Sequence, residues 1–542
     1  MPDVITDNQV ARLLPPLAEA ARATNRDATR FVPSRTGIVE ETSARRHQFI
    51  FGRRGVGKSS LLRKIESLGR EDSPRVVFVD IEKLARRPYP DVLIELLSTT
   101  LCSFRRNAHV EWAEPRSWIA TFRARRSARR LERELAQYLD MPLGGERVLT
   151  RRVNRSGRLS ITGWLGRGKR HEAGAEAHAG AEREKQSTDT IEYRSRTSKM
   201  EILRSLVPRI SDAIERFGSA ESSDTSLLVL DDFYHVPRES QPEVLTYLHQ
   251  VTKNTHVFLK ICGVRHKIRP FVEGDPPTGL QLGHDAGEVR VDLTLAQFEA
   301  ARTFLIRVLE GICGQHSVEP SQFLTDGGHE RAVLGSGGVA RDYLFLIHQG
   351  LRTANERQSS DPRPHNRITA EDINIASAKL SEQKQEDLKL DVGDEADQLR
   401  DRMQEIARFC LDTNGTNVFL VESIHLQETG WGREIQALAD LRFVHVFGDL
   451  SVQTGAHRGR RFIGFTLDLS HYTTTRSEKI KRIDFWKKGD SAKARRARLI
   501  YEPERAEAGA ARVHERALSE NNNADEALAG DWNQGTFDGF LE

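Results

Sequence analysis

The residues with the clearest chemical meaning form a glycine-rich run near the N-terminus. The run Gly52-Arg-Arg-Gly-Val-Gly-Lys-Ser59 fits the spacing G-x-x-x-x-G-K-[ST] without a departure. Glycines at these positions let backbone N–H groups surround the β- and γ-phosphates of a nucleotide, and a side chain at Gly57 would block that approach. Lys58 adds a charge between the two phosphates, and Ser59 offers a hydroxyl to Mg²⁺. The run predicts a phosphate-binding loop made by Gly52, Arg53, Arg54, Gly55, Val56, Gly57, Lys58, Ser59 and Ser60.

A pair of acids ends an apolar stretch, Leu227-Leu-Val-Leu-Asp-Asp232. A buried strand that ends in acids places carboxylates at the C-terminal edge of a parallel sheet, where open α/β sheets bind ligands. Taken alone, the acids fit an acid-capped turn equally well, but beside the loop we expect Asp231 to hold Mg²⁺ with Ser59. We expect Asp232 to orient or activate the attacking water. Most enzymes with such a loop that hydrolyse nucleotides fast carry glutamate at the position of Asp232. Because aspartate is one methylene shorter, we expect slow hydrolysis or a nucleotide switch.

The elements that must position these residues alternate between strand and helix. A helix is expected to follow the loop at once, and its positive N-terminal end would face the bound phosphates. Alternation of this kind predicts an α/β domain with a parallel sheet. Amphipathic stretches after the sheet predict a helical lid. The expected strands lie at 47–51, 75–80, 226–232 and 256–262, and the expected lid helices at 293–312, 329–352 and 369–381.

With these motifs in order, the chain resembles the AAA+ ATPases, and within them the origin-recognition-complex-like and STAND-type proteins. The further residues that carry the likeness are Gly337-Gly-Val-Ala-Arg341-Asp342 in the lid and the segment Ile368–Ile373 near its end. The resemblance implies a P-loop NTPase sheet, a helical lid and a following winged helix. It also implies ATP as the nucleotide, assembly into a homo-oligomer, and contact between Arg341 and the γ-phosphate.

Two positions depart from the family's pattern. The strand that usually ends in Asn, Ser or Thr reads Phe258-Leu-Lys-Ile-Cys-Gly263 here, which puts its water-positioning role in doubt. Arg265 and Arg269 follow that strand and are candidates for an arginine finger, although a solvated surface arginine explains either one. The histidines near this end of the sheet lack metal-ligand spacing and favour surface or core roles: His235, His256 and His266.

The C-terminal third has the layout of a winged helix. A helix over 432–441 precedes two strands, 443–447 and 461–467, that are expected to pair around a Gly/Arg turn. The basic stretch beyond residue 476 is a candidate for contact with DNA phosphates, and a solvated charged face is the alternative. Its aromatic pair, Phe485-Trp486, would either stack on bases or pack on the body of the protein. An arginine run over 123–133 reads as an exposed helix face, with nucleic-acid binding as the less favoured interpretation.

These signals divide the chain of 542 residues into five parts. The predicted parts are an N-terminal helical segment 1–45, a P-loop ATPase domain 46–290 with an insertion at 105–200, a helical lid 291–390, a winged-helix-like α+β domain 391–475, and a basic segment with an acidic disordered tail 476–542.

Composition excludes several classes of protein. Hydrophobic residues make up 38% and charged residues 29% of the chain, and no run of about 18 apolar residues occurs. The N-terminus has no basic-then-apolar signal, and four scattered cysteines without a C-x-x-C pair argue against a zinc ribbon or a disulfide framework. We therefore expect a cytoplasmic protein with reduced thiols and no membrane contact. A formal charge of +3 identifies no partner.

Two functions remain open from the sequence. One is an ATP-dependent switch or assembly ATPase that acts on DNA through the winged helix and basic segment. The other is a STAND-type signalling or defence ATPase whose C-terminal domain binds protein. A small-molecule kinase is disfavoured because the chain is long and shows no acceptor site.

Overall fold

The computed structural model describes residues 7–21, 31–68, 75–84, 87–107, 115–139, 147–152, 160–161, 190–195, 198–218, 225–360, 367–392, 396–452, 459–473 and 480–504. The predicted disordered tail and most of the stretch between 145 and 180 lie outside these residues. Among the helices described, none is long and apolar enough to cross a bilayer. All four cysteines are free thiols, and three of them are buried.

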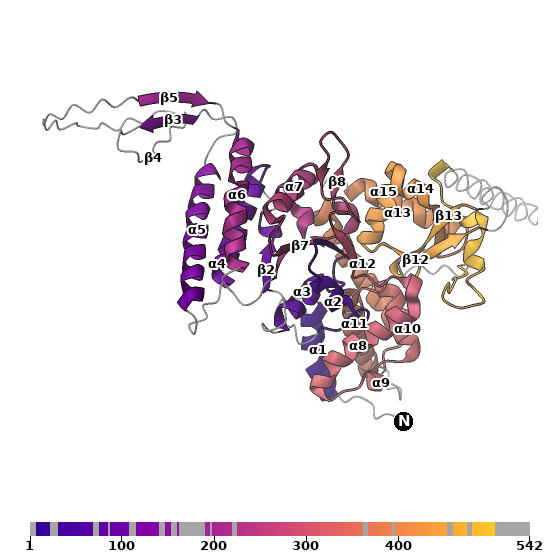
Figure 1. Ribbon diagram of the computed structural model, residues 1–542. Coiled ribbons are helices and arrows are strands. Elements are labelled where there is room, and N and C mark those ends of the chain that lie inside the picture. The colour runs from indigo at the N-terminus through magenta and orange to yellow at the C-terminus, as the bar shows by residue number, and fades with distance from the viewer. Residues whose placement is uncertain are drawn as a thin grey trace, which may run out of the picture.

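A parallel sheet of five strands forms the centre of the structure (Figure 1). The strand order is β10-β1-β7-β6-β2, and every neighbouring pair is parallel. This sheet confirms the α/β class, and its first four strands in the chain are those predicted. The fifth, β10, is short and carries two charged residues, so its pattern gave no signal. The strands are β1 (Gln48–Phe51), β2 (Arg75–Asp80), β6 (Ser226–Asp231), β7 (Val257–Gly263) and β10 (Gly287–Arg290).

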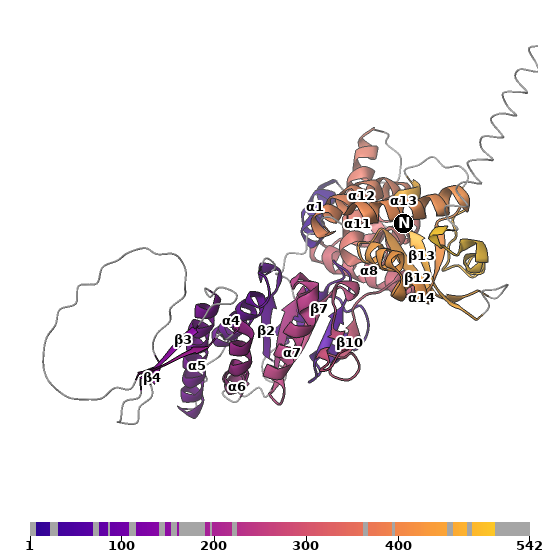
Figure 2. The same cartoon turned by 90° about the horizontal axis from the view of Figure 1, so that it is seen from above.

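Helices cover both faces of the sheet, which is why its strands are apolar on both sides (Figure 2). On one face, Leu61 and Ile65 pack in one cluster with Ile50 and Val229 of the strands. The opposite face carries a larger core to which four other helices contribute, three of which contact the strands directly. The first face is covered by α2 (Ile38–Ser43) and α3 (Lys58–Ser67), and the second by α4 (Asp91–Asn107), α6 (Lys199–Gly218) and α7 (Gln241–Thr252).

An extension of helices and a small antiparallel sheet continues beyond the β2 edge (Figures 1 and 2). The helix expected at the arginine run 123–133 is α5 (Pro115–Leu139), which packs against α4 and α6. Beyond it, β3 pairs antiparallel with both β4 and β5. These strands are β3 (Arg147–Arg152), β4 (Ser160–Ile161) and β5 (Thr190–Ser195).

A helical bundle follows the sheet in the chain, as the sequence predicts. The N-terminal helix α1 (Asp7–Ala21) packs on this bundle and not on the sheet, since Leu13 and Leu17 are fully buried within the bundle's core. The bundle, called the lid below, consists of α8 (Phe298–Cys313), α9 (Pro320–Phe323), α10 (Asp326–Ser336), α11 (Ala340–Ser360) and α12 (Ala370–Val392).

A separate three-stranded antiparallel sheet, in the order β11-β13-β12, forms the C-terminal unit together with four α-helices among the described residues. The predicted pairing of two strands near the end is that of β12 with β13. The elements are α13 (Ala396–Arg408), a π-helical turn (Phe409–Thr413), β11 (Val418–Glu422), α14 (Ser423–Glu428), α15 (Gly430–Asp440), β12 (Val444–Ser451), β13 (Arg461–Leu467) and α16 (Ser470–Thr473).

The basic segment is largely built into the body of the protein. Trp486 stacks on Phe298 of the lid at a ring distance of 4.3 Å, and Phe485 stacks on Phe447 at 4.4 Å. Tyr501 is fully buried, and its backbone N–H donates to Leu420 of β11. Of the two interpretations of the aromatic pair, packing on the body is therefore the one observed.

A buried ionic cluster joins the lid to the C-terminal unit. Lys384 of α12 lies 2.7 Å from Asp468, which also accepts a hydrogen bond from His445 at 3.0 Å. Asp342 of α11 pairs with Arg442 at 2.5 Å. Burial alone would raise the pKa of Asp468, but Lys384 and His445 hold it well below its usual value. The lid and the C-terminal unit thus share charges that water does not reach.

Lys384→Ala is expected to destabilise the fold by about 3–5 kcal/mol, because it leaves the Asp468 carboxylate buried without the lysine charge that pairs with it. Lys389→Ala on the exposed side of the same helix serves as the control and should change stability by less than about 0.5 kcal/mol. Denaturant unfolding followed by circular dichroism measures both. Equal effects of the two substitutions would contradict the ionic role of Lys384.

Candidate functional site

A pocket of about 500 Å³ lies where the loop after β1 meets the lid. Its floor is the loop and the start of α3, and one wall is the C-terminal edge of β2 and β6. The other wall comes from α1, the segment at Phe31 and Val32, and the lid helices α8 and α11. The seven predicted loop residues from Arg54 to Ser60 line it, whereas Gly52 and Arg53 do not.

The loop takes its shape from glycines with positive φ. Gly55 has φ 84° and Gly57 has φ 98°, a backbone region that other residues rarely adopt. No atom lies within 4 Å of the place where a side chain at Gly57 would begin. The space above this part of the loop is therefore left open by the protein's own atoms, as a phosphate-binding loop requires.

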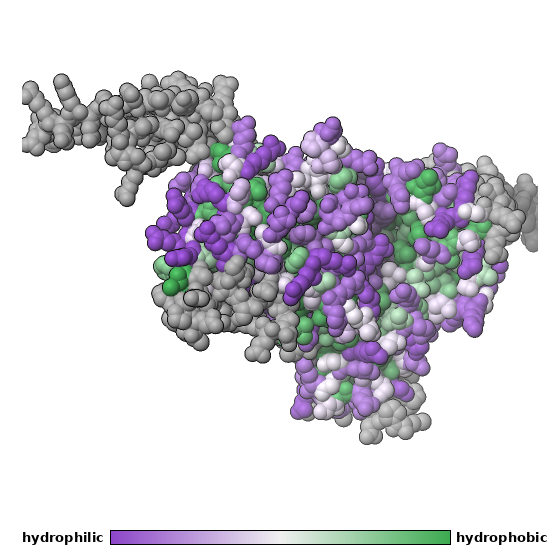
Figure 3. Space-filling model, in the orientation of Figure 1, coloured by the Kyte–Doolittle hydropathy of each residue, from purple (hydrophilic) through white to green (hydrophobic). Residues whose placement is uncertain are grey.

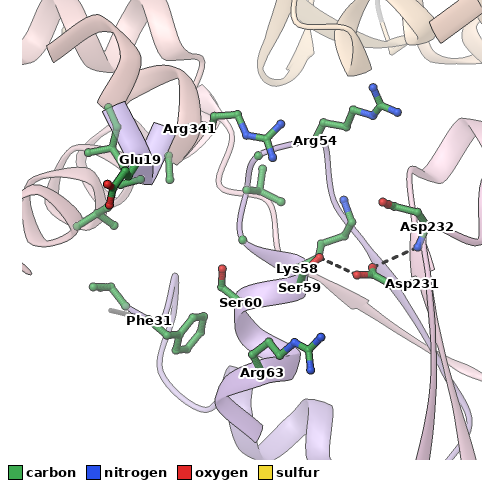
Figure 4. A pocket seen from close by; sticks show the side chains of 18 of the residues that line it. Glu19, Phe31, Arg54, Lys58, Ser59, Ser60, Arg63, Asp231, Asp232 and Arg341 are labelled. Carbon is green, nitrogen blue, oxygen red and sulfur yellow. Dashed lines mark hydrogen bonds between the residues drawn. The ribbon is translucent and has the colours of Figure 1, made fainter. Parts of the chain in front are cut away.

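Lys58 and Ser59 bring the loop and the acid-ended strand together (Figure 4). The Ser59 hydroxyl donates to Asp231 Oδ2 at 2.8 Å. Lys58 is buried, and its Nζ donates to the carbonyl of Gly52 at 2.7 Å and to that of Arg53 at 3.2 Å. The side chains predicted to hold a metal, Ser59 and Asp231, are thus in direct contact, although β7 separates β1, which leads into the loop, from β6.

Several acids meet at this edge of the sheet. Burial, and then the neighbouring charge of Asp232, raise the pKa of Asp231, while Ser59 and Lys58 lower it. Asp232 has φ 51°, and its N–H donates to Asp231 Oδ1 at 3.2 Å. A left-handed conformation in a residue other than glycine is strained, and such strain is commonly found at functional sites.

Three further acids line the pocket and were not singled out from the sequence: Glu19 of α1, Asp80 and Glu82. Asp80 ends β2 and lies in register with Asp231 of β6. Both Asp80 and Glu82 line the pocket. The signal that could have found Asp80 is the one used for Asp231, an apolar strand that ends in an acid.

No group of three or more His, Cys, Asp and Glu residues within the described ranges could hold a metal by itself. This agrees with the way Mg²⁺ is usually bound, through one or two protein oxygens, several waters and the phosphates of a nucleotide. The contact between Ser59 and Asp231 supplies such a pair of oxygens. The donor set therefore fits a nucleotide-bound Mg²⁺ and does not fit an independent metal centre.

The side chain of Arg53 is directed away from the pocket. Its guanidinium turns into the protein and donates to the carbonyls of Leu293 and Gly337 at 3.1 and 3.0 Å. It also pairs with Asp292 at 3.2 Å, and its backbone N–H donates to the same carboxylate. Arg53 thus fastens the loop to the segment that enters the lid, and only its main chain belongs to the loop.

Arg341 reaches the pocket from the lid, as Figure 4 shows. Its backbone N–H donates to the carbonyl of Gly55 at 3.2 Å. Arg54 extends the other way and donates to the hydroxyl of Tyr234, which follows Asp232 in the chain. The loop is therefore bonded to the lid through Gly55, and through Arg54 it is bonded to Tyr234, which lies just after β6.

The apolar part of the pocket comes from outside the sheet. Phe304 and Val308 of α8 and Leu344 of α11 face the segment at Phe31 and Val32. The sequence had indicated the amphipathic face of α8, but only the fold shows that part of it lines the pocket. A site that is polar at the loop and apolar beside the lid suits a ligand with a charged end and a flat, uncharged end.

The candidate arginine fingers and the histidines stay out of this pocket. Arg265 lies over the ring of Phe51, and Arg269 pairs with Glu239 at 2.9 Å. His266 pairs with Asp440 of α15, so the sheet domain contacts the C-terminal unit at that point.

Burial lowers the pKa of the Lys260 ammonium to about 7, and its Nζ donates to carbonyls just before β1, at Ala44 and Arg46.

Gly55→Ala and Gly57→Ala separate the conformational role of the loop from its contact with the lid. Gly57→Ala should destabilise the fold by about 1–2 kcal/mol, because a side chain is strained at this φ. Gly55→Ala should cost about 1–3 kcal/mol more, because the new Cβ would lie 2.7 Å from Arg341 Cβ. Equal losses in denaturant unfolding would show that the loop does not press on the lid.

Comparison with known proteins assigns no family to this arrangement. No protein-family model matches the sequence, and no curated protein matches it. What can be concluded about the site therefore depends on its own geometry. The site has a loop shaped by glycines, a lysine and a serine at the start of α3, and carboxylates at the end of β6.

Proposed function

We propose that the chain binds ATP with Mg²⁺ in this pocket and hydrolyses it slowly, as a nucleotide-dependent switch or assembly ATPase that associates with DNA. The observation that carries the proposal is the contact of Ser59 with Asp231 at the start of α3, beside a loop whose open face is made of backbone. A nucleoside triphosphate would supply the anionic chain for the loop and the terminal phosphoryl group for transfer to water.

The chain's own residues have separable roles in this proposal. Lys58 exchanges its two loop carbonyls for phosphate oxygens, and the amides of Gly55 to Ser59 donate to the phosphates. Ser59 and Asp231 hold Mg²⁺. Asp232 orients the attacking water and accepts its proton. The base packs against the apolar wall between Phe31 and the lid, and the resemblance to AAA+ ATPases favours adenine.

Arg341 couples the nucleotide in the pocket to the position of the lid. It belongs to the lid, yet its main chain bonds to the loop and its side chain lines the pocket. A γ-phosphate would attract this guanidinium and close the lid on the nucleotide. Since Arg265 and Arg269 do not line the pocket of their own chain, an arginine finger would come from a neighbouring subunit, which fits a homo-oligomer.

Contact with DNA is proposed through the C-terminal unit. Helices α14 and α15 followed by the β12–β13 ribbon resemble a winged helix, in which the second helix faces the DNA major groove. Exposed basic side chains without an ion pair to any described residue accompany it: Arg433, Lys488, Arg495, Arg496 and Arg498. Phosphate contacts by such residues would make binding strongly salt-dependent.

A STAND-type signalling or defence ATPase is the second candidate, and one contact favours it. His266 pairs with Asp440, so α15 lies against the sheet domain. In this alternative the C-terminal unit acts as a regulator that nucleotide exchange releases toward a protein partner, with no DNA contact. DNA binding that is absent, or that ignores salt, would favour this candidate.

Lys58→Ala is expected to abolish binding of Mg-ATP while leaving the fold intact, because it removes the charge that faces the phosphates. At a concentration 100 times its Kd, ATP should stabilise the wild type by about 2.7 kcal/mol and the variant not at all. Lys64→Ala on the same helix is the control and should bind normally. Unchanged ATP binding by the Lys58 variant would remove the proposed site.

Asp232→Asn should retain ATP binding but reduce turnover by roughly 100-fold, since an amide cannot accept the proton of water. Asp232→Glu extends the carboxylate by one methylene and should raise turnover by roughly tenfold. Phosphate release under saturating Mg-ATP measures both. If neither substitution alters turnover, Asp232 is not the base, and Glu82 or Asp80 becomes the carboxylate to test.

A further inference from the structure

Helix α5 has one face that the fold uses and one that it leaves in solvent. Its inner side packs on α4 and α6 through Ala124, Ala128, Leu131 and Leu135, all of them buried. The outer side carries a group of exposed arginines, called the arginine arc below. The arginine arc consists of Arg123, Arg126, Arg129, Arg130 and Arg133.

The spacing of the arginine arc gathers its charges on one narrow strip. At 3.6 residues per turn the five side chains fall within roughly 120° of the helix circumference. At 1.5 Å per residue they extend over roughly 15 Å of its axis. Five positive charges thus occupy a surface comparable in width to a nucleic-acid groove.

The acids of the helix do not neutralise this strip. Glu132 pairs with Arg105 of α4, and Glu134 pairs with Arg209 of α6, so both are used in holding α5 to its neighbours. The pKa of Glu134 is lowered first by its hydrogen bond with Arg209 and to a smaller extent by the charge of Arg130 in the arc. A helix face kept merely soluble usually mixes charges of both signs, and this one does not among its described side chains.

Apolar side chains next to the arginines also point to a partner. Phe122 is 59% exposed and Ile119 is 40% exposed, and both fall on the same side of the helix as the arginine arc. In Figure 3 the surface over α5, at the left of the view, is otherwise strongly hydrophilic. Exposed large apolar groups beside concentrated positive charge are typical of an interface and not of an ordinary solvated helix.

The position of α5 separates it from the C-terminal unit. Figures 1 and 2 place α5 at one end of the molecule and β12–β13 at the other. The small sheet that projects beyond α5 begins with β3, whose sequence Arg-Val-Leu-Thr-Arg-Arg contains three arginines and no acid. The basic character of this end therefore continues past the helix along the chain.

We propose that the arginine arc binds the sugar–phosphate backbone of double-stranded DNA, as a second contact distinct from the one assigned to the C-terminal unit. An α-helix with its side chains is roughly 10–12 Å wide and the major groove roughly 12 Å, so arginines at both margins of the arc reach the two bordering phosphate rows. Guanidinium groups hold phosphates by paired hydrogen bonds. Single strands are held by successive aromatic platforms, whereas Phe122 is the one exposed aromatic side chain among the described residues beside the arc.

Two DNA contacts on opposite ends would let one chain bridge two segments of a duplex, or follow a long one. The contact at α5 does not depend on ATP binding, so it can stand or fall separately from the proposed ATPase. Because the arc contacts phosphates and no base edges are assigned to it, its binding should not depend on sequence.

The test compares two double variants of the full chain. Arg126→Gln with Arg133→Gln removes two charges from the arc. Arg204→Gln with Arg352→Gln removes two exposed charges elsewhere and is the control. Binding to two unrelated 30-base-pair duplexes is measured from about 50 to 200 mM salt, with ATP binding and thermal unfolding recorded alongside.

The arc variant should lose roughly tenfold in affinity for both duplexes at low salt, and its log–log salt slope should fall by roughly 2. The control should match the wild type, and both variants should bind ATP and unfold as the wild type does. Equal slopes for the arc variant and the control would overturn the proposal. So would tighter binding of the wild type to single-stranded DNA, duplex RNA or polyglutamate than to duplex DNA.

Arg495→Gln with Arg496→Gln tells the two DNA contacts apart. These point substitutions are preferable to deletion of the basic segment, because Ile500 and Tyr501 of that segment are buried. If this variant alone lowers the salt slope, the contact at α5 is refuted while the proposed C-terminal contact stands. If the Arg126/Arg133 variant and the Arg495/Arg496 variant lower the salt slope by similar amounts, the chain has the two contacts proposed.

Discussion

The hydrogen bond from Ser59 to Asp231 is the interaction on which the site depends. It joins the start of α3 to the end of β6, two strands away from β1 in a sheet where β7 lies between them. A parallel sheet makes this contact feasible, because the carboxyl ends of all its strands meet at one edge. Asp231 is largely shielded from water there, which raises its pKa and makes a positive partner favourable. The polar floor of the pocket follows from this arrangement.

The second constraint is that the loop belongs to the lid as much as to the sheet. Arg53 binds two carbonyls on the lid side, and the Gly55 carbonyl accepts from Arg341. A loop held in this way cannot shift to receive phosphates without shifting the lid. The neighbour of Arg341 in the chain, Asp342, pairs with Arg442 of the C-terminal unit. Main-chain and side-chain contacts thus run without a break from the pocket to the last unit of the chain.

The features that the sequence predicts are those encoded by neighbouring residues. The first four strands of the sheet and the amphipathic helices after it depend on short patterns and lie close to the expected positions. The helix expected at 329–352 is the exception, because Gly337, with φ 59°, ends α10 before α11 begins. The features it does not predict depend on contacts between distant segments. Asp80 enters the pocket because β2 pairs with β6, and Arg53 turns inward because Asp292 and Gly337 lie beside it. The acid that ends β2 is visible in the sequence, but no local pattern places β2 beside β6 or Arg53 beside Asp292 and Gly337.

The same distinction explains why the basic segment was interpreted only in part. Its charges are visible in the sequence, but its burial depends on Phe298 and Phe447, more than a hundred residues apart, each providing an aromatic surface. α1 is a parallel case, because an amphipathic pattern shows that it needs a partner and does not show that the partner is the lid.

The C-terminal unit is fixed at two points that flank the end of α15. Asp440 pairs with His266 of the sheet domain, and Arg442, two residues later, pairs with Asp342 of the lid. One short stretch of chain therefore touches both bodies that enclose the pocket. If the lid moves relative to the sheet, these two ion pairs cannot both keep their geometry, because one joins the C-terminal unit to the sheet domain and the other joins it to the lid. The buried pair at Arg442 is the harder one to break, because separating it would leave charges without water. The contact at Asp440 is then the one that yields, and α15 would be released from the sheet domain whenever the pocket changes its opening.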